Sequence, residues 1–491
     1  MNSKNALISG IRHAQNFTLT ENIALTHKST LSNLLDWFAL GGALRERTED
    51  DIVNIFQRAY GEDPLKALKV LFYFRDIRGG GQGERRSFRA CLKWLANNHS
   101  DVLKKNMEHI PFYGRWDDLY SLIGTPVESY AFVVVKLQLV KDVIAASNGE
   151  SVSLLAKWLK SENTSSTESR RLGRKTRESL GWSPRKYRKV LSNLRRIIDV
   201  TEVKMCANEW NDINFEHVPS KAGLRYRKAF SKHEASRYVE YLSNVASGKA
   251  KINAGAVYPY ELLEAALNDC MEVTTKAIDL QWLNQPDWLA DNPHKGLVLA
   301  DVSGSMTGRP MMISVSLAIY FAERNVGPFK DHCMTFSARA YLHHIVGQTL
   351  REKYNNITQE GWCGNTDLQA AFDVILETAV NNQVPQEDMP AVLYVISDLE
   401  FDAACNSNDK TNFQMAEAKF RDAGYVMPNI VFWNVNARND QTPVTMDVNG
   451  VCLVSGCSPS ILKSVLSGKP FNPMAILEET IGKERYDRIS L

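Results

Sequence analysis

The chain has 491 residues, more than one hydrophobic core usually supports, so we expect at least two domains. Its 44% hydrophobic and 23% charged residues are typical of globular proteins and exclude a disordered or fibrous chain. The net charge is only +2, so a nucleic-acid surface would require local clustering of cations.

The segment from about residue 30 to residue 283 shows helical periodicity, with apolar residues at helical spacing and polar residues opposite them. Strand-like alternation is nearly absent. We therefore expect residues 1–285 to form an all-α domain, a HEAT-like solenoid or ring. The best examples of the pattern are residues 63–77, 84–107, 129–147, 184–210 and 233–246.

Four glycines lie within residues 75–89, RDIRGGGQGERRSFR. A phosphate-binding loop would need a lysine followed by serine or threonine, and a preceding strand. Gly83 is followed by Glu84 and Arg85 instead, and the flanks are predicted to be helical. We interpret the segment as a tight connection between helices that uses left-handed glycines.

Two clusters of cations stand out from the near-neutral chain. Within residues 170–196 eleven cations accompany a single acid, Glu178, and a second cluster spans residues 221–232 with Tyr226 among its cations. Lysine and arginine contact phosphates, and interleaved aromatic rings can stack on bases, so these clusters favour RNA binding. The alternative is a solvated helix face. The candidate RNA-binding residues are Arg170, Arg171, Arg174, Lys175, Arg177, Arg185, Lys186, Arg188, Lys189, Arg195, Arg196, Lys221, Arg225, Arg227 and Lys228.

From residue 286 onward apolar strands alternate with amphipathic helices, which predicts a mostly parallel sheet covered on both faces. Ligands of such sheets bind beyond the carboxyl ends of the strands. The predicted strands are 296–303, 331–338, 339–346, 391–399, 428–436 and 450–456, and the predicted helices are 309–325, 366–382, 411–423 and 458–467.

Three separated pieces of this second domain carry oxygen ligands. Asp301, Ser303 and Ser305 follow an apolar strand at alternate positions, Thr366 follows a glycine-containing turn, and Asp398 ends another apolar strand. A carboxylate and hydroxyls that converge at strand ends suit a hard divalent cation. Asp367 could be a supporting acceptor or only the residue that opens a helix. Catalysis is the weaker interpretation, with His332, His343 and His344 as candidates by type alone, and we expect no enzyme.

The pattern Asp-x-Ser-x-Ser, followed by a threonine and then an aspartate, resembles the metal-ion-dependent adhesion site (MIDAS) of von Willebrand factor A domains. The resemblance implies that residues 286–491 form an α/β, Rossmann-like A domain. It also implies that Ser303, Ser305 and Thr366 ligate Mg²⁺ directly, and that Asp301 and Asp398 hold it directly or through water. In such domains a carboxylate of a partner protein completes the metal coordination.

A helical first part followed by an A domain resembles the TROVE-domain (Ro autoantigen) family. More locally, the segments at 75–85, 110–119 and 251–262 are similar to an uncharacterised viral, plant and microbial family with this layout. The Ro resemblance implies a ribonucleoprotein scaffold that binds small noncoding or misfolded RNA.

We therefore expect an α+β multidomain, RNA-binding scaffold whose magnesium-bearing A domain recognises an acidic side chain of a protein partner. The alternative is a metal-dependent protein interaction module, or a structural assembly component, that does not bind RNA. The N-terminus lacks the apolar core of a signal peptide and no apolar run reaches the ~18 residues of a membrane span. A cytoplasmic protein without a membrane partner is the expectation, and its oligomeric state stays open.

Overall fold

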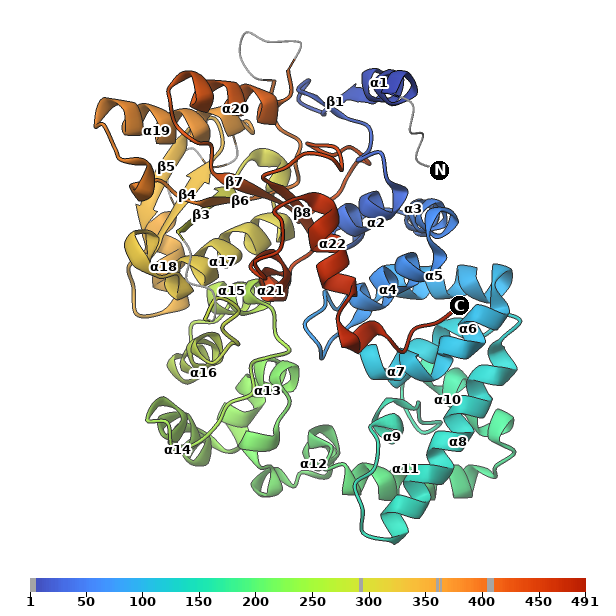
Figure 1. Cartoon of the computed structure of the whole chain (residues 1–491). Coiled ribbons are helices and arrows are strands. Elements are labelled where there is room, and N and C mark those ends of the chain that lie inside the picture. Colours follow the sequence, from blue (N-terminus) through green and yellow to red (C-terminus); the bar gives the residue numbers. More distant parts are fainter. Residues whose placement is uncertain (1–5, 291–294, 359–361, 363, 404–409) are drawn as a thin grey trace. The chain divides into compact units, whose positions relative to one another are not determined.

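The computed structural model describes residues 6–290, 295–358, 362, 364–403 and 410–491 (Figure 1). The chain forms two compact units. A sheet unit comprises residues 1–70 and 257–484, and a helical unit comprises residues 71–256 and 485–491. Among the described residues, none of the helices combines the length and the apolar character that crossing a bilayer would need.

The helical unit confirms the predicted all-α region. Helix α4 (Pro64–Arg75) passes from the sheet unit into this unit, and a 3₁₀ segment, η2 (Trp116–Leu122), precedes its longest helix, α8. Its remaining helices are α5 (Arg86–Asn98), α6 (Ser100–Asn106), α7 (Ile110–Tyr113), α8 (Glu128–Ser147), α9 (Leu155–Trp158), α10 (Thr167–Leu180), α11 (Pro184–Ile197), α12 (Thr201–Ala207), α13 (Ser220–His233) and α14 (Ala235–Ala246).

The glycine-rich segment is a tight connection between α4 and α5, as predicted. Gly80 and Gly83 adopt positive φ values of 85° and 68°, which other residues rarely adopt. A Cβ atom on Gly81 would lie 2.1 Å from the carbonyl oxygen of Tyr73. The backbone conformation of this connection therefore requires the glycines.

Helix α8 departs from the predicted pattern of polar residues opposite an apolar face. One side buries Phe132, Val135 and Leu139 in the helical unit. The other side is also apolar and is exposed, with Leu137 at 52% and Ile144 at 55% exposure. Helical spacing alone did not separate these two faces, because apolar residues occupy both of them.

The sheet unit is built on six strands in the order β5-β4-β3-β6-β7-β8, parallel except for the antiparallel edge strand β5. All six were predicted. Of these six strands, β3 comes first in the chain and lies in the middle of the sheet. Later strands are added first on one side of it and then on the other, so the direction of winding reverses between β3 and β6. Doubly wound sheets bind ligands at this point. The strands are β3 (Gly296–Asp301), β4 (His332–Phe336), β5 (Ala340–His344), β6 (Val392–Ser397), β7 (Asn429–Asn434) and β8 (Val451–Ser455).

Helices cover both faces of this sheet (Figure 1). On one face Leu299, Val395 and Phe432 pack in a core that includes Phe372 of α19 (Leu368–Asn381) and Phe420 of α20 (Asn412–Asp422). Alternate residues point to the other face, where Tyr394 meets Phe321 of α17 (Arg309–Arg324) with ring centroids 4.4 Å apart. Burial on both sides explains why the strands are continuous apolar runs.

Some further elements of the sheet unit were predicted and others were not, and one prediction was only partly right. The predicted helix 458–467 is a 3₁₀ turn, Pro459–Ile461, followed by the short α21 (Leu462–Val465). The other elements of the unit are α1 (Ala6–Ala14), β1 (Phe17–Leu19), β2 (Leu25–His27), α2 (Asn33–Gly41), α3 (Glu49–Glu62), α15 (Pro259–Leu267), α16 (Glu272–Leu283), α18 (Leu350–Ile357) and α22 (Pro473–Ile481). Helices α2, α3, α15 and α16 lie in the region predicted to be helical, whereas α1, β1, β2, α18 and α22 were not predicted.

The two compact units do not divide the chain between residues 285 and 286, where the change from a helical to an alternating sequence pattern placed the domain boundary. Residues before 70 and the helices α15 and α16 belong to the sheet unit. Helix α2 packs on β8 and α15 packs on α17. These helices bury apolar faces against the sheet layer, which their local sequence pattern could not reveal.

Candidate functional site

The first loop of the candidate metal site begins where β3 ends. The backbone N–H of Ser303 donates to Asp301 Oδ1 at 2.9 Å, which turns the chain back toward the carboxylate. The Ser303 and Ser305 hydroxyl oxygens lie 3.2 Å apart. Asp301 and Ser303 are fully buried, and Ser305 is partly exposed. The two hydroxyls therefore lie side by side beside a buried carboxylate.

Hydrogen bonds tie the other two loops to the first. Ser397, at the end of β6, donates to Asp301 Oδ2 at 2.5 Å, so the strands that carry Asp301 and Asp398 are linked at their ends. The Gly304 N–H donates to the carbonyl of Gly364, two residues before the buried Thr366. The structure thus brings the three predicted pieces to one edge of the sheet.

Asp367 and Leu399 show how the loops hold their shape. Asp367 is the N-cap of α19, where its side chain accepts from the Ala370 N–H at 3.0 Å, so it opens this helix. Leu399, directly after Asp398, has a φ of 65°. A leucine in this left-handed region is strained, and such strain is found at functional sites when surrounding contacts enforce it.

The sequence did not point to Arg438, which lies beside the candidate site. Its guanidinium donates to Asp398 Oδ2 at 3.1 Å and pairs with Glu21 Oε2 at 2.7 Å. Arg438 follows β7, so the rule that ligands gather beyond the carboxyl ends of parallel strands could have found it. One protein cation thus already faces one of the two buried carboxylates.

The N-terminal segment around Glu21 is anchored to the loop that follows Asp398. Glu400 accepts from the Glu21 N–H at 2.9 Å and from the Asn439 amide at 2.8 Å. Thr20 donates to the carbonyl of Phe401 at 2.7 Å. This segment therefore fixes the loop that carries Asp398, although it lies almost 380 residues away in the sequence.

The electrostatics of the site suit a divalent cation. Burial and then the nearby Asp398 carboxylate raise the pKa of Asp301. In the part of the chain that the structure describes, Arg438 is the one cation that pairs with these two buried carboxylates, which favours a further cation. Oxygen donors without nitrogen or sulfur are what Mg²⁺ selects. Among the described residues no cluster of three or more His, Cys, Asp or Glu side chains has a metal-binding arrangement. The candidate site differs from such clusters, because most of its donors are serine and threonine hydroxyls.

His343 is part of the sheet rather than of a candidate catalytic site. It is buried on β5, its Nε2 lies 2.7 Å from Thr335 Oγ1 on β4, and burial lowers its pKa. His332 and His344 stack on each other, with ring centroids 4.8 Å apart.

The candidate RNA-binding residues separate into exposed and packed groups. Helix α11 starts at the N-cap Ser183 with Pro184 in its first turn, and buries Tyr187, Leu191 and Leu194. Its opposite side is exposed and cationic, and within the described part of the chain its four N-terminal cations pair with no carboxylate. We call this surface the α11 cationic face; its residues are Arg185, Lys186, Arg188, Lys189 and Arg196.

Arg195 lies in the same helix and has a structural role. Its guanidinium donates to the carbonyls of Ala156 and Leu159 at 2.9 and 2.7 Å and to Ser161 Oγ at 2.8 Å. Burial lowers its pKa. These three bonds fix α9 and the chain that follows it onto α11.

On α10, several predicted contacts are ion pairs with acids outside residues 170–196. Arg171 pairs with Glu168 at 2.7 Å, Lys175 with Glu128 at 2.7 Å and Arg177 with Glu162 at 2.8 Å. Once these acids are counted, the excess of positive charge around α10 is smaller than the sequence of residues 170–196 suggests. Arg170 and Arg174 are exposed; on α13, Lys221, Arg225 and Lys228 are exposed and Arg227 donates to the carbonyl of Leu224.

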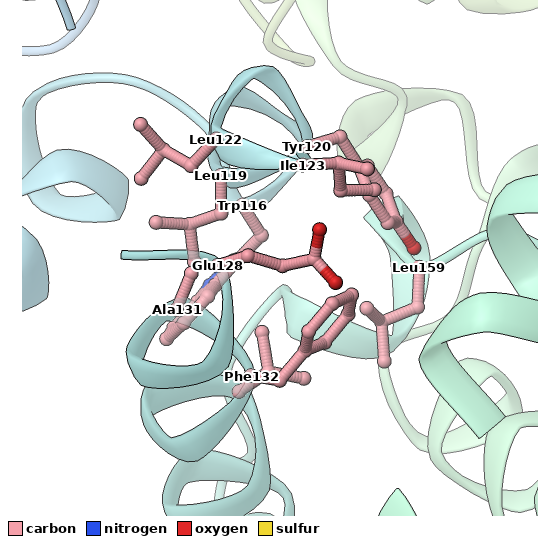
Figure 2. A pocket seen from close by; sticks show the side chains of 10 residues that line it. Trp116, Leu119, Tyr120, Leu122, Ile123, Glu128, Ala131, Phe132 and Leu159 are labelled. Atoms are coloured by element: carbon pink, nitrogen blue, oxygen red, sulfur yellow. The ribbon is translucent and has the colours of Figure 1, made fainter. Parts of the chain in front are cut away.

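A small apolar hollow lies between η2 and the inner face of α8 (Figure 2). It encloses about 290 Å³, part of which is open to solvent, and Glu128 points into it. The Glu128 carboxylate accepts from the Gly124 N–H at 2.7 Å and pairs with Lys175. Its charge is thus already balanced by the protein itself.

The family described as "Domain of unknown function (DUF2828)" matches residues 20–131 and 151–292, more than half of the chain. The chain belongs to the DUF2828 family. A second family, "Domain of unknown function (DUF7788)", matches residues 295–488. The two matches meet between residues 292 and 295, close to the change of texture in the sequence.

One relative and one solved structure are similar over most of the chain. An uncharacterized protein of Acanthamoeba polyphaga mimivirus, L728, is 29% identical over 94% of this chain and 86% of its own length. The crystal structure of the Deinococcus radiodurans RO (RSR) protein aligns with 92% of this chain and 100% of its own, at 15% identity and a TM-score of 0.48. That similarity is distant.

Proposed function

We propose that this protein is a non-enzymatic, Ro-like scaffold that binds RNA through the α11 cationic face. The observation that carries the proposal is the orientation of this helix. Tyr187, Leu191 and Leu194 anchor one side, and the exposed cations occupy the other.

Residues 185, 188, 189 and 196 share one side of α11, because they are three, four and eleven positions apart. Such a row follows a phosphate backbone without reading its sequence. Lys186 lies over the Trp182 ring, 4.7 Å from its centroid. A partly exposed tryptophan at the helix start offers a surface on which an unpaired base can stack.

The test compares two variants that lose the same charge. One changes Arg185, Lys186, Arg188 and Lys189 to alanine; the control changes four exposed cations of the sheet unit, Lys330, Arg339, Lys410 and Arg421, to alanine. Binding of a structured RNA with single-stranded ends is measured by fluorescence anisotropy from low to moderate salt.

We expect the α11 variant to lose affinity and to reduce the slope of log affinity against log salt by about 3, since each phosphate contact on a single strand contributes about 0.7. The control should retain the affinity of the unchanged protein. Equal losses in both variants would show only a general charge effect and would refute the proposal, as would no binding at low salt.

A second proposed function is carried by the convergence of Asp301, Ser303 and Ser305 with the end of β6. We propose that Asp301, Ser303, Ser305, Thr366 and Asp398 hold Mg²⁺, directly or through water, and that the ion accepts a carboxylate from a partner protein. When bound, the ion would supply an electrophilic position for that carboxylate. This function uses a different unit and is compatible with RNA binding.

Thermal unfolding of the whole protein tests the metal site. We expect Mg²⁺ to raise the unfolding temperature of the unchanged protein in a saturable way, because a ligand that binds only the folded state stabilises it. The rise should vanish in Asp301→Ala and persist in Asp388→Asn, which alters an exposed carboxylate. The same rise in both variants would refute the metal site.

A further inference from the structure

The exposed side of α8 is a continuous apolar stripe. Along a 20-residue helix, five large side chains follow one another at spacings of three, four, three and four residues, the spacing of a coiled-coil seam. Surface helices of globular proteins normally carry polar residues on the side that faces water. The stripe consists of Tyr130 (38% exposed), Val133 (47%), Leu137 (52%), Val140 (47%) and Ile144 (55%).

The inner side of the same helix explains why the stripe is free to face outward. Phe132, Val135 and Leu139 already pack in the helical unit, and Asp142 is buried and accepts from the Ser153 hydroxyl at 2.7 Å. The helix is therefore fixed by one face, and the stripe adds nothing to that packing. From residue 130 to residue 144 it extends about 21 Å, close to four helical turns.

Lysines border both edges of the stripe. With 100° per residue, Lys141 lies about 40° to one side of Leu137 and Lys136 about 100° to the other, and both are exposed. An apolar seam with a cation on each edge is complementary to a helix that carries an apolar seam between carboxylates.

The same charges argue against a second copy of this chain. In a parallel pair of identical helices, Lys136 of each helix would lie opposite Lys141 of the other, so both edges of the seam would bring like charges together. An acidic partner converts both of these repulsions into attractions.

We infer that α8 is a docking site for an amphipathic helix of another protein, one with an apolar stripe flanked by glutamate or aspartate. This surface lies in the helical unit. It is distinct from the candidate metal site and does not depend on the functions proposed above.

Two synthetic helical peptides test the inference. Both carry the same leucine and isoleucine seam over four turns; one has glutamate and the other lysine at the edge positions. Binding of each labelled peptide to the whole protein is measured by fluorescence anisotropy. We expect the glutamate peptide to bind about five-fold or more tightly than the lysine peptide, since two edge pairs each contribute modestly.

Substitutions on the helix sharpen the test. Lys136→Glu with Lys141→Glu should reverse the preference between the peptides. Leu137→Gln with Val140→Gln should weaken the glutamate peptide about ten-fold or more. Val426→Gln, which alters an apolar side chain 70% exposed in the sheet unit, should leave binding unchanged. Circular dichroism confirms that each variant is folded.

Three outcomes would overturn the inference. The first is equal binding of both peptides, or binding that survives Leu137→Gln with Val140→Gln. The second is a homodimer in sedimentation that these substitutions dissociate, which would assign the stripe to a second copy. The third is flotation with phosphatidylcholine–phosphatidylserine vesicles that the same substitutions abolish, which would assign it to a membrane surface.

Discussion

The arginines around Asp118 and the cations of α11 belong to the same helical unit, but the first group points into the protein and the second points into solvent. Arg75 is 2% exposed and bonds to Asp118 Oδ2 at 2.8 Å, while Arg89 bonds to Asp118 Oδ1 at 2.8 Å. Burial alone would raise the pKa of Asp118, but the two arginines more than offset this and lower it. On α11, the cations from Arg185 to Lys189 are exposed to solvent.

The difference teaches that cation density does not decide whether arginines hold a fold together or bind a partner. The deciding factor is an acceptor within reach: a carboxylate for Arg75 and Arg89, and backbone carbonyls for Arg195. Asp118 is shared by two guanidinium groups of other helices and also accepts from the Arg115 N–H at 2.9 Å. The following predictions test this contrast through stability and binding.

The largest effect is expected for Asp118→Asn. Removing this carboxylate leaves Arg75 buried without its counter-charge, which costs about 3–5 kcal/mol in the free energy of unfolding. Urea unfolding measures the loss. The matched control is Asp101→Asn, whose carboxylate is 89% exposed and pairs with Lys104 at the surface, and which should be nearly neutral. Similar losses in both would refute the contrast.

A smaller effect is expected for Arg195→Met, because α11 contains both kinds of cation. Arg195 donates three hydrogen bonds to α9 and the chain that follows it, so its loss should lower the free energy of unfolding by about 2 kcal/mol. Arg196→Met, one position further and exposed, should keep stability and weaken RNA binding instead. If Arg196→Met destabilised the protein as much, α11 would not be divided as described.

The four substitutions to alanine on α11 should leave stability almost unchanged, within about 0.5 kcal/mol per site. Alanine is the best helix former, and its introduction removes like-charge neighbours three and four residues apart. Thermal unfolding at low salt checks this. A loss of several degrees would mean that these cations stabilise the fold and would weaken the case for a binding surface.

The smallest effect is expected for Glu168→Gln on α10. This change frees Arg171 from its ion pair at the surface and adds one potential phosphate contact. RNA affinity should rise slightly, and the salt slope should become steeper by less than one. Glu387→Gln, in the sheet unit, provides the control for lost negative charge. An RNA affinity equal to that of the control would place α10 outside the binding surface.

The sequence predicted much of the sheet unit, because its signals are local. Each strand is an apolar run between turns, and the order of Asp301, Thr366 and Asp398 along the chain matched the three loops that meet at the sheet edge. Arg438 and Glu21 escaped prediction. A lone arginine carries no local pattern beyond its position after a strand, and its partner Glu21 is distant in the sequence.

The helical unit was predicted less completely. Apolar periodicity located the helices but gave α8 a polar side that it does not have. It also gave no sign that Arg195 packs inward while Arg196 points outward. Two adjacent arginines are equivalent in a charge count, and only their neighbours in space distinguish them.

By itself, therefore, the sequence determined which segments become strands and helices and which side chains follow the strand ends, because periodicity and turn chemistry act over a few residues. Only the tertiary structure decided which charges are neutralised and which apolar stripe stays exposed. Those outcomes depend on through-space distances to residues such as Asp118, Glu128 and Glu162, and local sequence does not encode such distances.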